Sequence, residues 1–422
     1  MTAVVIAFVV FFVLVLLEVP VAYSLLISSS AAVLLASPVP IGIVVERTFA
    51  STQSFLLLAV PFFILAGDLL ASGKLGRQLV DLAAAVVGRF NGGLGQASVV
   101  TSMAFGGVSG SAVADASGIG SVLIPWQTRE GYPARFAAAV NAASSTIGVI
   151  VPPSIPMIVY ASVANVSVAG LFIAGIVPGV LVGVSQLAIC WWVAKRNGYP
   201  RHRQPFDGAR LVKQVGLALP AILMPVLVIV ALVGGVATVT EVSVVAAVYA
   251  LLLRVLVYRD LGLPQLLRIL TSTAMATGVV MWLIMTSTAL AWLLTVSQLP
   301  AQLATWFASA GIGLFGVVLF MNVVMIVVGM FLDMPAAILL LAPVFIPLAD
   351  AVGLGLLQLG IIMTLNLALG LFTPPVGTTL YISTAIAKEK IENVAKALVP
   401  FYVAGLATLL LVSYVPAITI TP

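Results

Sequence analysis

The sequence predicts an all-α membrane protein made of two repeats with inverted topology, and three observations support this prediction. Of its 422 residues, 62% are hydrophobic and 7% are charged, whereas soluble domains are about half apolar and about one quarter charged. Apolar stretches of about 17 to 25 residues recur along the chain, which is the length that crosses a hydrocarbon core about 30 Å thick. Finally, Gly148 and Pro152-Pro153 recur 222 residues later as Gly370 and Pro374-Pro375.

The first repeat covers residues 1–194. Its opening stretch is expected to be a retained span, because no basic residue precedes it and no small-residue cleavage site follows it. Residues 92–125 are rich in Gly and Ser and break near Gly107, which predicts a re-entrant helical hairpin. Residues 134–162 break at Pro152-Pro153 and predict an interrupted helix. Full spans are expected near residues 3–17, 21–36, 52–71 and 168–194.

The second repeat, residues 215–422, follows a basic linker at residues 195–214 that we place in the cytoplasm. The only histidine, His202, lies in this linker and is expected to be solvated, without a catalytic role. A second hairpin is expected at residues 314–350 and a second broken helix at residues 358–386. The remaining spans are expected near residues 215–233, 239–257, 272–297 and 397–418, with amphipathic connectors near residues 74–89 and 299–310.

The distribution of basic residues supports the two hairpins. If each hairpin returns to its starting side, each repeat has five crossings, and this odd number inverts the second repeat. Seventeen of the eighteen Lys and Arg residues then share one face, which the positive-inside rule identifies as the cytoplasm. Only Arg47 lies on the other face, where both termini are also expected. The seventeen are Lys74, Arg77, Arg89, Arg129, Arg135, Lys195, Arg196, Arg201, Arg203, Arg210, Lys213, Arg254, Arg259, Arg268, Lys388, Lys390 and Lys396.

The breaks in the first repeat predict a binding site, because non-helical backbone at membrane depth must be buried in protein or line an aqueous cavity. In carriers with inverted repeats, paired broken helices mark that site. Free carbonyls at the end of one half-helix suit a cation, and amides at the start of the next suit an anion. The alternative is that the small residues only allow close helix packing. Candidate Na⁺ ligands are Gly107, Ser109, Ser111, Ser145 and Pro153, and candidate substrate ligands are Ser109, Gly110, Ser111 and Ser154.

The second repeat offers a matching tip and break. Asp333 stands where the first tip has Ser111. An acid at membrane depth is a functional candidate, but Asp333 followed by Pro335 also fits a helix N-cap. Asp115, on the first hairpin, leaves the same two alternatives open. Candidate Na⁺ ligands are Gly329, Asp333, Thr373, Gly377 and Thr378, and candidate substrate ligands are Thr373, Pro375 and Thr378.

The polar groups predicted at the breaks include no Lys or Arg. An anionic substrate would therefore be held by half-helix N-termini, hydroxyl groups and bound cations. Bound Na⁺ would make the anion site favourable only when the cation sites are filled, and this predicts coupled transport.

These motifs resemble the large membrane subunit of tripartite ATP-independent periplasmic (TRAP) transporters, the DctM-like family, over essentially the whole chain. One departure is Val149 after Gly148, where family members often have a proline. The resemblance rests on Phe105-Gly106-Gly107-Val108-Ser109-Gly110-Ser111-Ala112, Glu130-Gly131-Tyr132-Pro133, Ser145-Thr146-Ile147-Gly148, Pro152-Pro153-Ser154, Leu171-Phe172-Ile173-Ala174-Gly175-Ile176-Val177-Pro178-Gly179 and Thr373-Pro374-Pro375-Val376-Gly377.

The resemblance implies a Na⁺-driven importer of an organic acid anion in the bacterial inner membrane, with no cofactor besides Na⁺. It implies two partners: a separate small membrane subunit of four helices and a soluble periplasmic protein that delivers the substrate. It also implies an elevator mechanism, in which the first three spans of each repeat form a scaffold and the hairpins with the broken helices form a transport domain that slides across the membrane. The first hairpin would gate the cytoplasmic side and the second the periplasmic side.

Other functions are less consistent with the sequence. A stand-alone ion-coupled dicarboxylate carrier would share the hairpins and remains the main alternative. A membrane enzyme lacks support, because no span carries a His/Glu metal motif or paired carboxylates, and no P-loop for ATP is present. A channel would need a ring of filter residues. The basic residues lie between spans, which argues against a nucleic-acid partner, and the single Cys190 excludes a disulfide framework.

Overall fold

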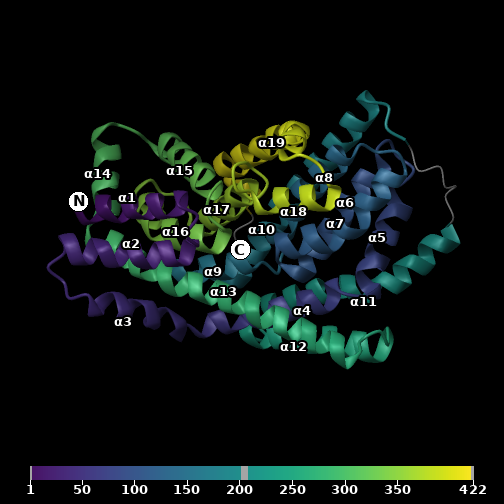
Figure 1. Cartoon of the computed structure of the whole chain (residues 1–422), viewed down its shortest axis with the longest axis horizontal. Coiled ribbons are helices and arrows are strands. Elements are labelled where there is room, and N and C mark those ends of the chain that lie inside the picture. Colours follow the sequence, from purple (N-terminus) through teal and green to yellow (C-terminus); the bar gives the residue numbers. More distant parts are fainter. Residues whose placement is uncertain (1, 201–207, 420–422) are drawn as a thin grey trace.

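The computed structural model describes residues 2–200 and 208–419, and within these ranges every regular element is helical (Figure 1). Six helices of the described residues are long and apolar enough to cross a membrane, or seven if one bent pair counts as a single span. The prediction of an all-α membrane protein is confirmed. His202 lies outside the described residues.

The chain begins with two antiparallel apolar helices, α1 (Thr2–Leu16) and α2 (Val21–Ala36), which pack together. The span expected at residues 52–71 is longer than predicted: α3 (Gly42–Ala50), two short 3-10 turns and α4 (Ala59–Ala71) form a pair bent by 61°. The helix breaks at Ser54, whose backbone is extended. An amphipathic helix, α5 (Lys74–Val87), follows where a connector was expected.

The next segment contains the first hairpin and the first broken helix. The hairpin arms are α6 (Gly93–Ser109) and α7 (Ala112–Arg129). The broken helix consists of α8 (Ala134–Ser144), a 3-10 turn and α9 (Ile155–Ala164), with the Pro152-Pro153 pair between the last two. The long helix α10 (Val168–Arg196) closes this part.

The second part of the described chain runs from α11 to α19. Its helix α13 begins nine residues before the expected residue 272, because the apolar stretch is preceded by helical turns that carry Gln265 and Arg268. The second hairpin is α15 and α16, and the second broken helix is α17 and α18. The bounds are α11 (Gly208–Val233), α12 (Val239–Leu252), α13 (Leu263–Val296), α14 (Leu299–Ser309), α15 (Leu314–Gly329), α16 (Met334–Ala351), α17 (Leu356–Gly370), α18 (Thr378–Ala387) and α19 (Ile391–Tyr414).

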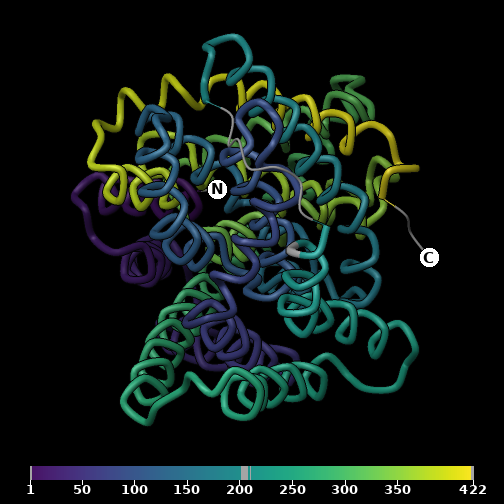
Figure 2. Tube along the Cα trace, turned by 90° about the vertical axis from the view of Figure 1, so that its right-hand side faces the viewer, coloured from purple at the N-terminus to yellow at the C-terminus, as the bar shows by residue number. Residues whose placement is uncertain are grey.

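The helices form two groups, which are visible along the long axis of the molecule (Figure 2). The first group packs around α13, which contacts α2, α3 and α4, while α12 packs on α4. The second group contains the hairpins and broken helices, and its two parts interlock. Helix α18 packs on α8, and α9 packs on α17; Asn141 donates a hydrogen bond to Ser383 at 2.9 Å, and Tyr160 donates to the Leu356 carbonyl at 2.7 Å.

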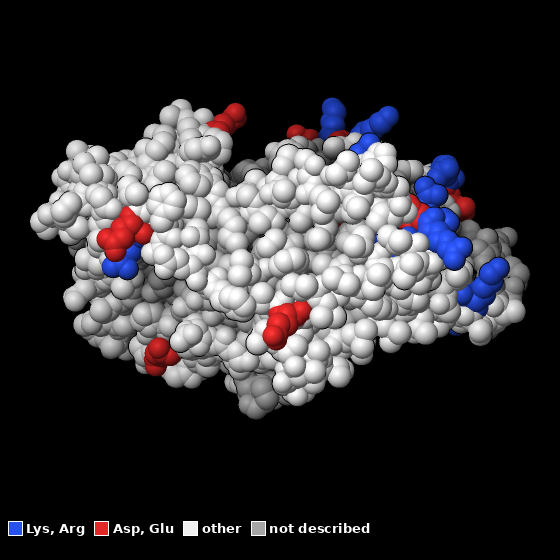
Figure 3. All heavy atoms as spheres, turned by 90° about the horizontal axis from the view of Figure 1, so that it is seen from below, with Lys and Arg blue, Asp and Glu red and all other residues white. Residues whose placement is uncertain are grey.

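Basic side chains gather toward one end of the long axis on the face shown in Figure 3. This is the end at which α5 lies in Figure 1. Arg254, which was expected on the cytoplasmic face, has a fully buried side chain. It pairs with Asp260 at 2.7 Å and also donates to the Leu69 carbonyl at 2.9 Å. The hydrogen bond from Arg254 to Leu69 holds the segment that follows α12 against the end of α4.

Candidate functional site

The first hairpin tip is a short break between opposing helix ends. Helix α6 ends at Ser109, and Gly110 adopts a left-handed conformation with φ of 57°, which glycine tolerates without steric cost. Ser111 caps α7, since its hydroxyl accepts a hydrogen bond from the Ala114 amide at 3.3 Å. The tip therefore presents the carbonyl end of one helix and the amide end of the next.

The tip fits tightly against the backbone on two sides. A Cβ added to Gly110 would lie 2.8 Å from the Pro153 carbonyl oxygen, so the tip rests on the first proline break. A Cβ added to Gly67 would lie 2.8 Å from the Ser109 Cα, so α4 presses on the tip from the other side. Two of the predicted residues, Ser109 and Pro153, are thus brought to the same place by different segments.

The second tip contributes Asp333, which occupies the N-cap position of α16. Its side chain makes no capping hydrogen bond, although its carbonyl accepts one from the Ala337 amide at 3.0 Å. The side chain is exposed, and it lines the same cavity as the first tip. Capping therefore does not account for this carboxylate.

A cavity of about 310 Å³ lies where the two tips meet α4 and α13. We call it the tip cavity. Its polar lining includes an acid that the sequence analysis did not select, Asp68 of α4, which accepts a hydrogen bond from Thr273 of α13 at 3.0 Å. Asp68 could have been selected from the sequence, because an acidic residue inside an apolar span is a functional candidate. The polar residues and glycines that line the cavity are Gly67, Asp68, Ser109, Gly110, Ser111, Ser117, Ser272 and Asp333.

Other candidates of the first repeat lie beneath the tip. Ser154 is fully buried and caps α9, while its neighbours Ile155 and Pro156 line the tip cavity. Ser145 is also buried and donates to the Ala142 carbonyl at 3.0 Å. A Cβ on Gly107 would meet the Pro152 carbonyl oxygen at 3.2 Å, so close packing accounts for this glycine.

The candidates at the second break are not brought to the tip cavity, where Leu371 is the nearest contributor from that segment. Thr373 donates to the Leu369 carbonyl at 2.6 Å, whereas the buried hydroxyl oxygen of Thr378 has no hydrogen-bond partner within residues 2–200 and 208–419. A Cβ on Gly377 would lie 2.9 Å from the carbonyl oxygens of Leu371 and Thr373, which therefore converge on this glycine. Gly329 packs on Gly370, and Pro375 is exposed.

Asp115 lies away from the cavity, in the interior of the first hairpin. Ser111, not Asp115, caps α7, which excludes the capping alternative for this acid. One carboxylate oxygen accepts a hydrogen bond from the Ser102 hydroxyl at 3.1 Å, and the Ser144 hydroxyl lies 3.1 Å from that of Ser102. The other oxygen is buried without a hydrogen-bond partner among the described residues. The network connects both hairpin arms with the broken helix.

Comparison with known protein families gives one match along almost the whole chain. The family model described as "Tripartite ATP-independent periplasmic transporter, DctM component" matches residues 8–418.

Several curated proteins are similar over nearly their full length. The protein y4mL of Sinorhizobium fredii, described as uncharacterized, is 48% identical over 98% of both chains. The C4-dicarboxylate TRAP transporter large permease protein DctM of Pseudomonas aeruginosa is 35% identical over 94% of this chain and 93% of its own. The sialic acid TRAP transporter large permease protein SiaM of Vibrio cholerae is 33% identical over 95% and 94%.

Solved structures share the fold at low sequence identity. The YdaH transporter of Alcanivorax borkumensis superposes with a TM-score of 0.64 over 99% of both chains at 15% identity. MtrF of Neisseria gonorrhoeae gives a TM-score of 0.62 over 96% of this chain and 94% of its own, at 11% identity. With the family match, the permease relatives and the apolar helices together, the chain belongs to the DctM component family of TRAP transporters and is an integral inner-membrane protein.

Proposed function

We propose that this chain is the large membrane subunit of a Na⁺-coupled symporter that imports a small organic acid anion. The observation that carries the proposal is the lining of the tip cavity. Its ionisable groups are Asp68 and Asp333, with no Lys or Arg among the described lining residues. An anion entering such a cavity meets like charge, so bound cations are needed before it can stay. Na⁺ is a hard cation that suits carboxylate, hydroxyl and carbonyl oxygens.

Two positions suit the cations. At the first tip, Ser109 and Ser111 lie beside the Pro153 carbonyl group. The hydroxyl and carbonyl oxygens of these residues can coordinate a cation. At the second break, the carbonyls that converge on Gly377 adjoin Thr378, whose hydroxyl lacks a partner. The amide ends of α7 and α16 then complete an anion site with the bound cations.

The two halves are proposed to be inverted repeats. Helix α7 begins at Ala112 and α16 at Met334, while α8 begins at Ala134 and α17 at Leu356. Both pairs are separated by the offset of 222 residues that the sequence motifs show. Both Pro-Pro bonds at the breaks are cis. An internal duplication of odd crossing number places the first hairpin on one side of the membrane and the second on the other.

Transport is proposed to occur by an elevator movement. One wall of the tip cavity comes from α4 and α13, and the opposite wall comes from the hairpins and broken helices. The first wall would be a fixed scaffold and the second a transport domain. A cavity formed at such a boundary opens to alternate sides when one body slides. The first hairpin would gate the cytoplasmic side and the second the periplasmic side.

The orientation follows from the clustered charges. The end rich in Lys and Arg faces the cytoplasm, and both termini then face the periplasm. The proposed partners are a separate small membrane subunit of four helices and a periplasmic binding protein that delivers the substrate. The substrates printed in the names of relatives are isethionate, C4-dicarboxylate, 2,3-diketo-L-gulonate and sialic acid, all of which are organic acids.

The proposal is tested by uptake into proteoliposomes that contain the chain and its small subunit. A panel of labelled dicarboxylates, keto acids and sugar acids is offered with the binding protein, under an inward Na⁺ gradient or with choline in place of Na⁺. We expect uptake of an acid that needs both Na⁺ and the binding protein. Equal uptake in choline at constant pH contradicts Na⁺ coupling, and full uptake without the binding protein supports the stand-alone carrier.

A further inference from the structure

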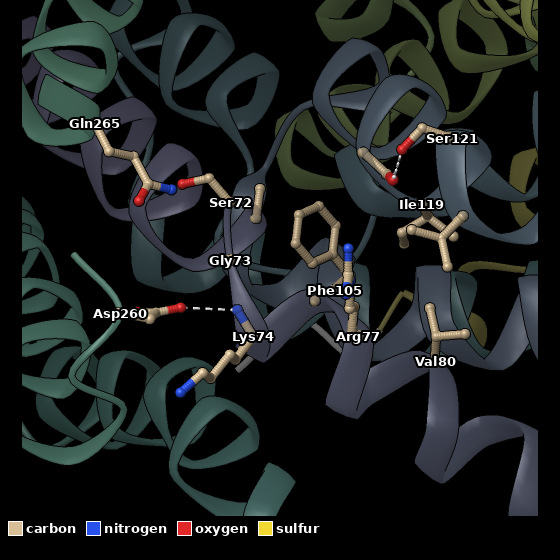
Figure 4. Close-up of a pocket in the computed structure, with 14 residues that line it drawn as sticks. Ser72, Gly73, Lys74, Arg77, Val80, Phe105, Ile119, Ser121, Asp260 and Gln265 are labelled. Carbon is tan, nitrogen blue, oxygen red and sulfur yellow. Dashed lines mark hydrogen bonds between the residues drawn. The ribbon is translucent and has the colours of Figure 1, made fainter. Parts of the chain in front are cut away.

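The structure has a second cavity, larger than the tip cavity, and Figure 4 shows the residues that line it. It has a volume of about 500 Å³, and we call it the vestibule. Its wall on one side consists of the end of α4, the start of α5 and the segment between α12 and α13. On the other side it is lined by the hairpin, with Phe105 from α6 and residues 118–122 from α7.

The vestibule continues the tip cavity along three helices. On α4, Asp68 lines the tip cavity and Ala71 lines the vestibule, about one turn later. On α7, Ser117 lines the tip cavity and the next residue, Gly118, lines the vestibule. On α13, Gln265 of the vestibule lies about two turns before Ser272. The two cavities are therefore lined by neighbouring turns of the same three helices.

Of the charged residues that line the vestibule, two already form hydrogen bonds within the described part of the chain and one does not. The Asp260 carboxylate already accepts hydrogen bonds from Arg254 at 2.7 Å and from the Lys74 amide at 2.8 Å. The Lys74 ammonium donates to the Tyr258 carbonyl at 3.3 Å. Arg77 is exposed and has neither an ion pair nor a hydrogen bond with the described residues.

Figure 4 shows the Arg77 side chain standing beside Phe105, while Lys74 points away from it. The charged residues that line the vestibule are Lys74, Arg77 and Asp260, so its wall has a net positive charge. Among them, only the Arg77 guanidinium forms no hydrogen bond with the described residues. This group binds carboxylates through two parallel hydrogen bonds.

We propose that the vestibule is a second anion-binding site, in which Arg77 holds a carboxylate of the substrate on its way between the tip cavity and the cytoplasm. The anion's identity as the transported substrate rests on the proposed function, whereas the site itself does not. The two cavities differ in the charge of their walls, and this difference would favour movement of the anion from the tip cavity to the vestibule. The tip cavity has acidic walls and depends on bound cations, and the vestibule attracts the anion without them.

The test uses the charge of a thiol reagent as the probe. In a Cys190→Ala background, Ser121→Cys places one thiol at the exposed vestibule wall. Labelling rates are measured in inside-out vesicles with an anionic and a cationic methanethiosulfonate of similar size. A unit charge about 6 Å away in water changes each rate about threefold, in opposite directions. We expect Arg77→Gln to lower the anionic-to-cationic rate ratio about tenfold and Arg77→Lys to preserve it.

The matched control is Arg259→Gln, which removes an exposed charge that does not line either cavity. This variant is expected to leave the ratio unchanged. Sodium succinate, compared with sodium chloride at equal ionic strength, is expected to slow anionic labelling in the parent and not in Arg77→Gln. An unchanged ratio in Arg77→Gln, or no protection by succinate in the parent, overturns the proposed site. These readouts need no transport, so they fail independently of Na⁺-coupled uptake.

Discussion

The backbones of Gly106 and Gly148 are in direct contact, which seats the first hairpin on the first broken helix. A Cβ added to Gly106 would lie 2.4 Å from the Gly148 Cα. The second half has the same kind of contact, since a Cβ on Gly370 would lie 2.5 Å from the Gly329 carbonyl oxygen. Each hairpin therefore packs against the neighbouring break through a pair of glycines. Both sides of each contact are backbone atoms, so no flexible side chain could move to make room for a larger residue.

Gly106→Ala is expected to destabilise the protein. Overpacking costs about 1–3 kcal/mol, and a clash with backbone belongs at the upper end of that range. Thermal unfolding of the purified protein in detergent measures the effect. Gly278→Ala on α13 is the control, because a Cβ there meets nothing within 4 Å and alanine favours a helix by up to about 1 kcal/mol. Equal melting temperatures for the two variants would show that the contact is not tight.

Arg254→Gln is expected to lower stability by about 3–5 kcal/mol, because it removes one partner of a buried ion pair. The variant leaves the Asp260 carboxylate without its 2.7 Å contact. Thermal unfolding is again the measurement, and the exposed Arg259→Gln is the matched control with an expected change within about 0.5 kcal/mol. A loss no larger than that of the control would mean that Asp260 is hydrated when Arg254 is absent.

Asp333→Asn is expected to raise the Na⁺ concentration needed for half-maximal uptake at least about tenfold. Unit charges about 4 Å apart interact by about 4 kcal/mol at an effective dielectric constant of about 20, so losing the carboxylate weakens a nearby cation strongly. The Na⁺ dependence of uptake in proteoliposomes checks this. Asp350→Asn, at the exposed far end of the same helix, should leave the dependence unchanged. Similar curves for both variants would remove Asp333 from the cation site.

Ser111→Ala is expected to reduce the stabilisation that Na⁺ gives. A ligand at a concentration 100 times its Kd stabilises the folded state by about 2.7 kcal/mol, so melting temperatures in NaCl should exceed those in choline chloride. The variant also loses a helix cap, which costs about 1 kcal/mol in either salt, and only the difference between salts reports on the ion. Ser121→Ala on the same helix is the control. An unchanged difference in Ser111→Ala would argue against a cation at the first tip.

The helix ends of the hairpins were predictable because glycine and proline mark them locally. Helices α15 and α16 begin and end within one residue of the expected 314 and 350, whereas α7 continues to Arg129, four residues past the expected end at 125. The helix α3 was missed because Glu46 and Arg47 lie together within its nine residues, which lowers the local hydropathy of this part of the bent pair.

The site was predictable only in part, because its second wall comes from distant segments. Ser109, Ser111 and Asp333 were found from the tips that contain them. Asp68 was not, since its partner Thr273 is 205 residues away and contacts of that range leave no local pattern. Arg254 was missed for a related reason: charge counting treats every basic residue as solvated, and burial depends on tertiary packing.

The inverted arrangement of the two hairpins is the central claim, and labelling of single cysteines tests it most directly. In a Cys190→Ala background, Arg129→Cys and Asp350→Cys place exposed thiols at the ends of α7 and α16. A membrane-impermeant maleimide is applied to right-side-out and inside-out vesicles. We predict that Arg129→Cys reacts only from the cytoplasmic side and Asp350→Cys only from the periplasmic side. Reaction of both thiols from the same side would contradict the inverted repeats and the transport mechanism built on them.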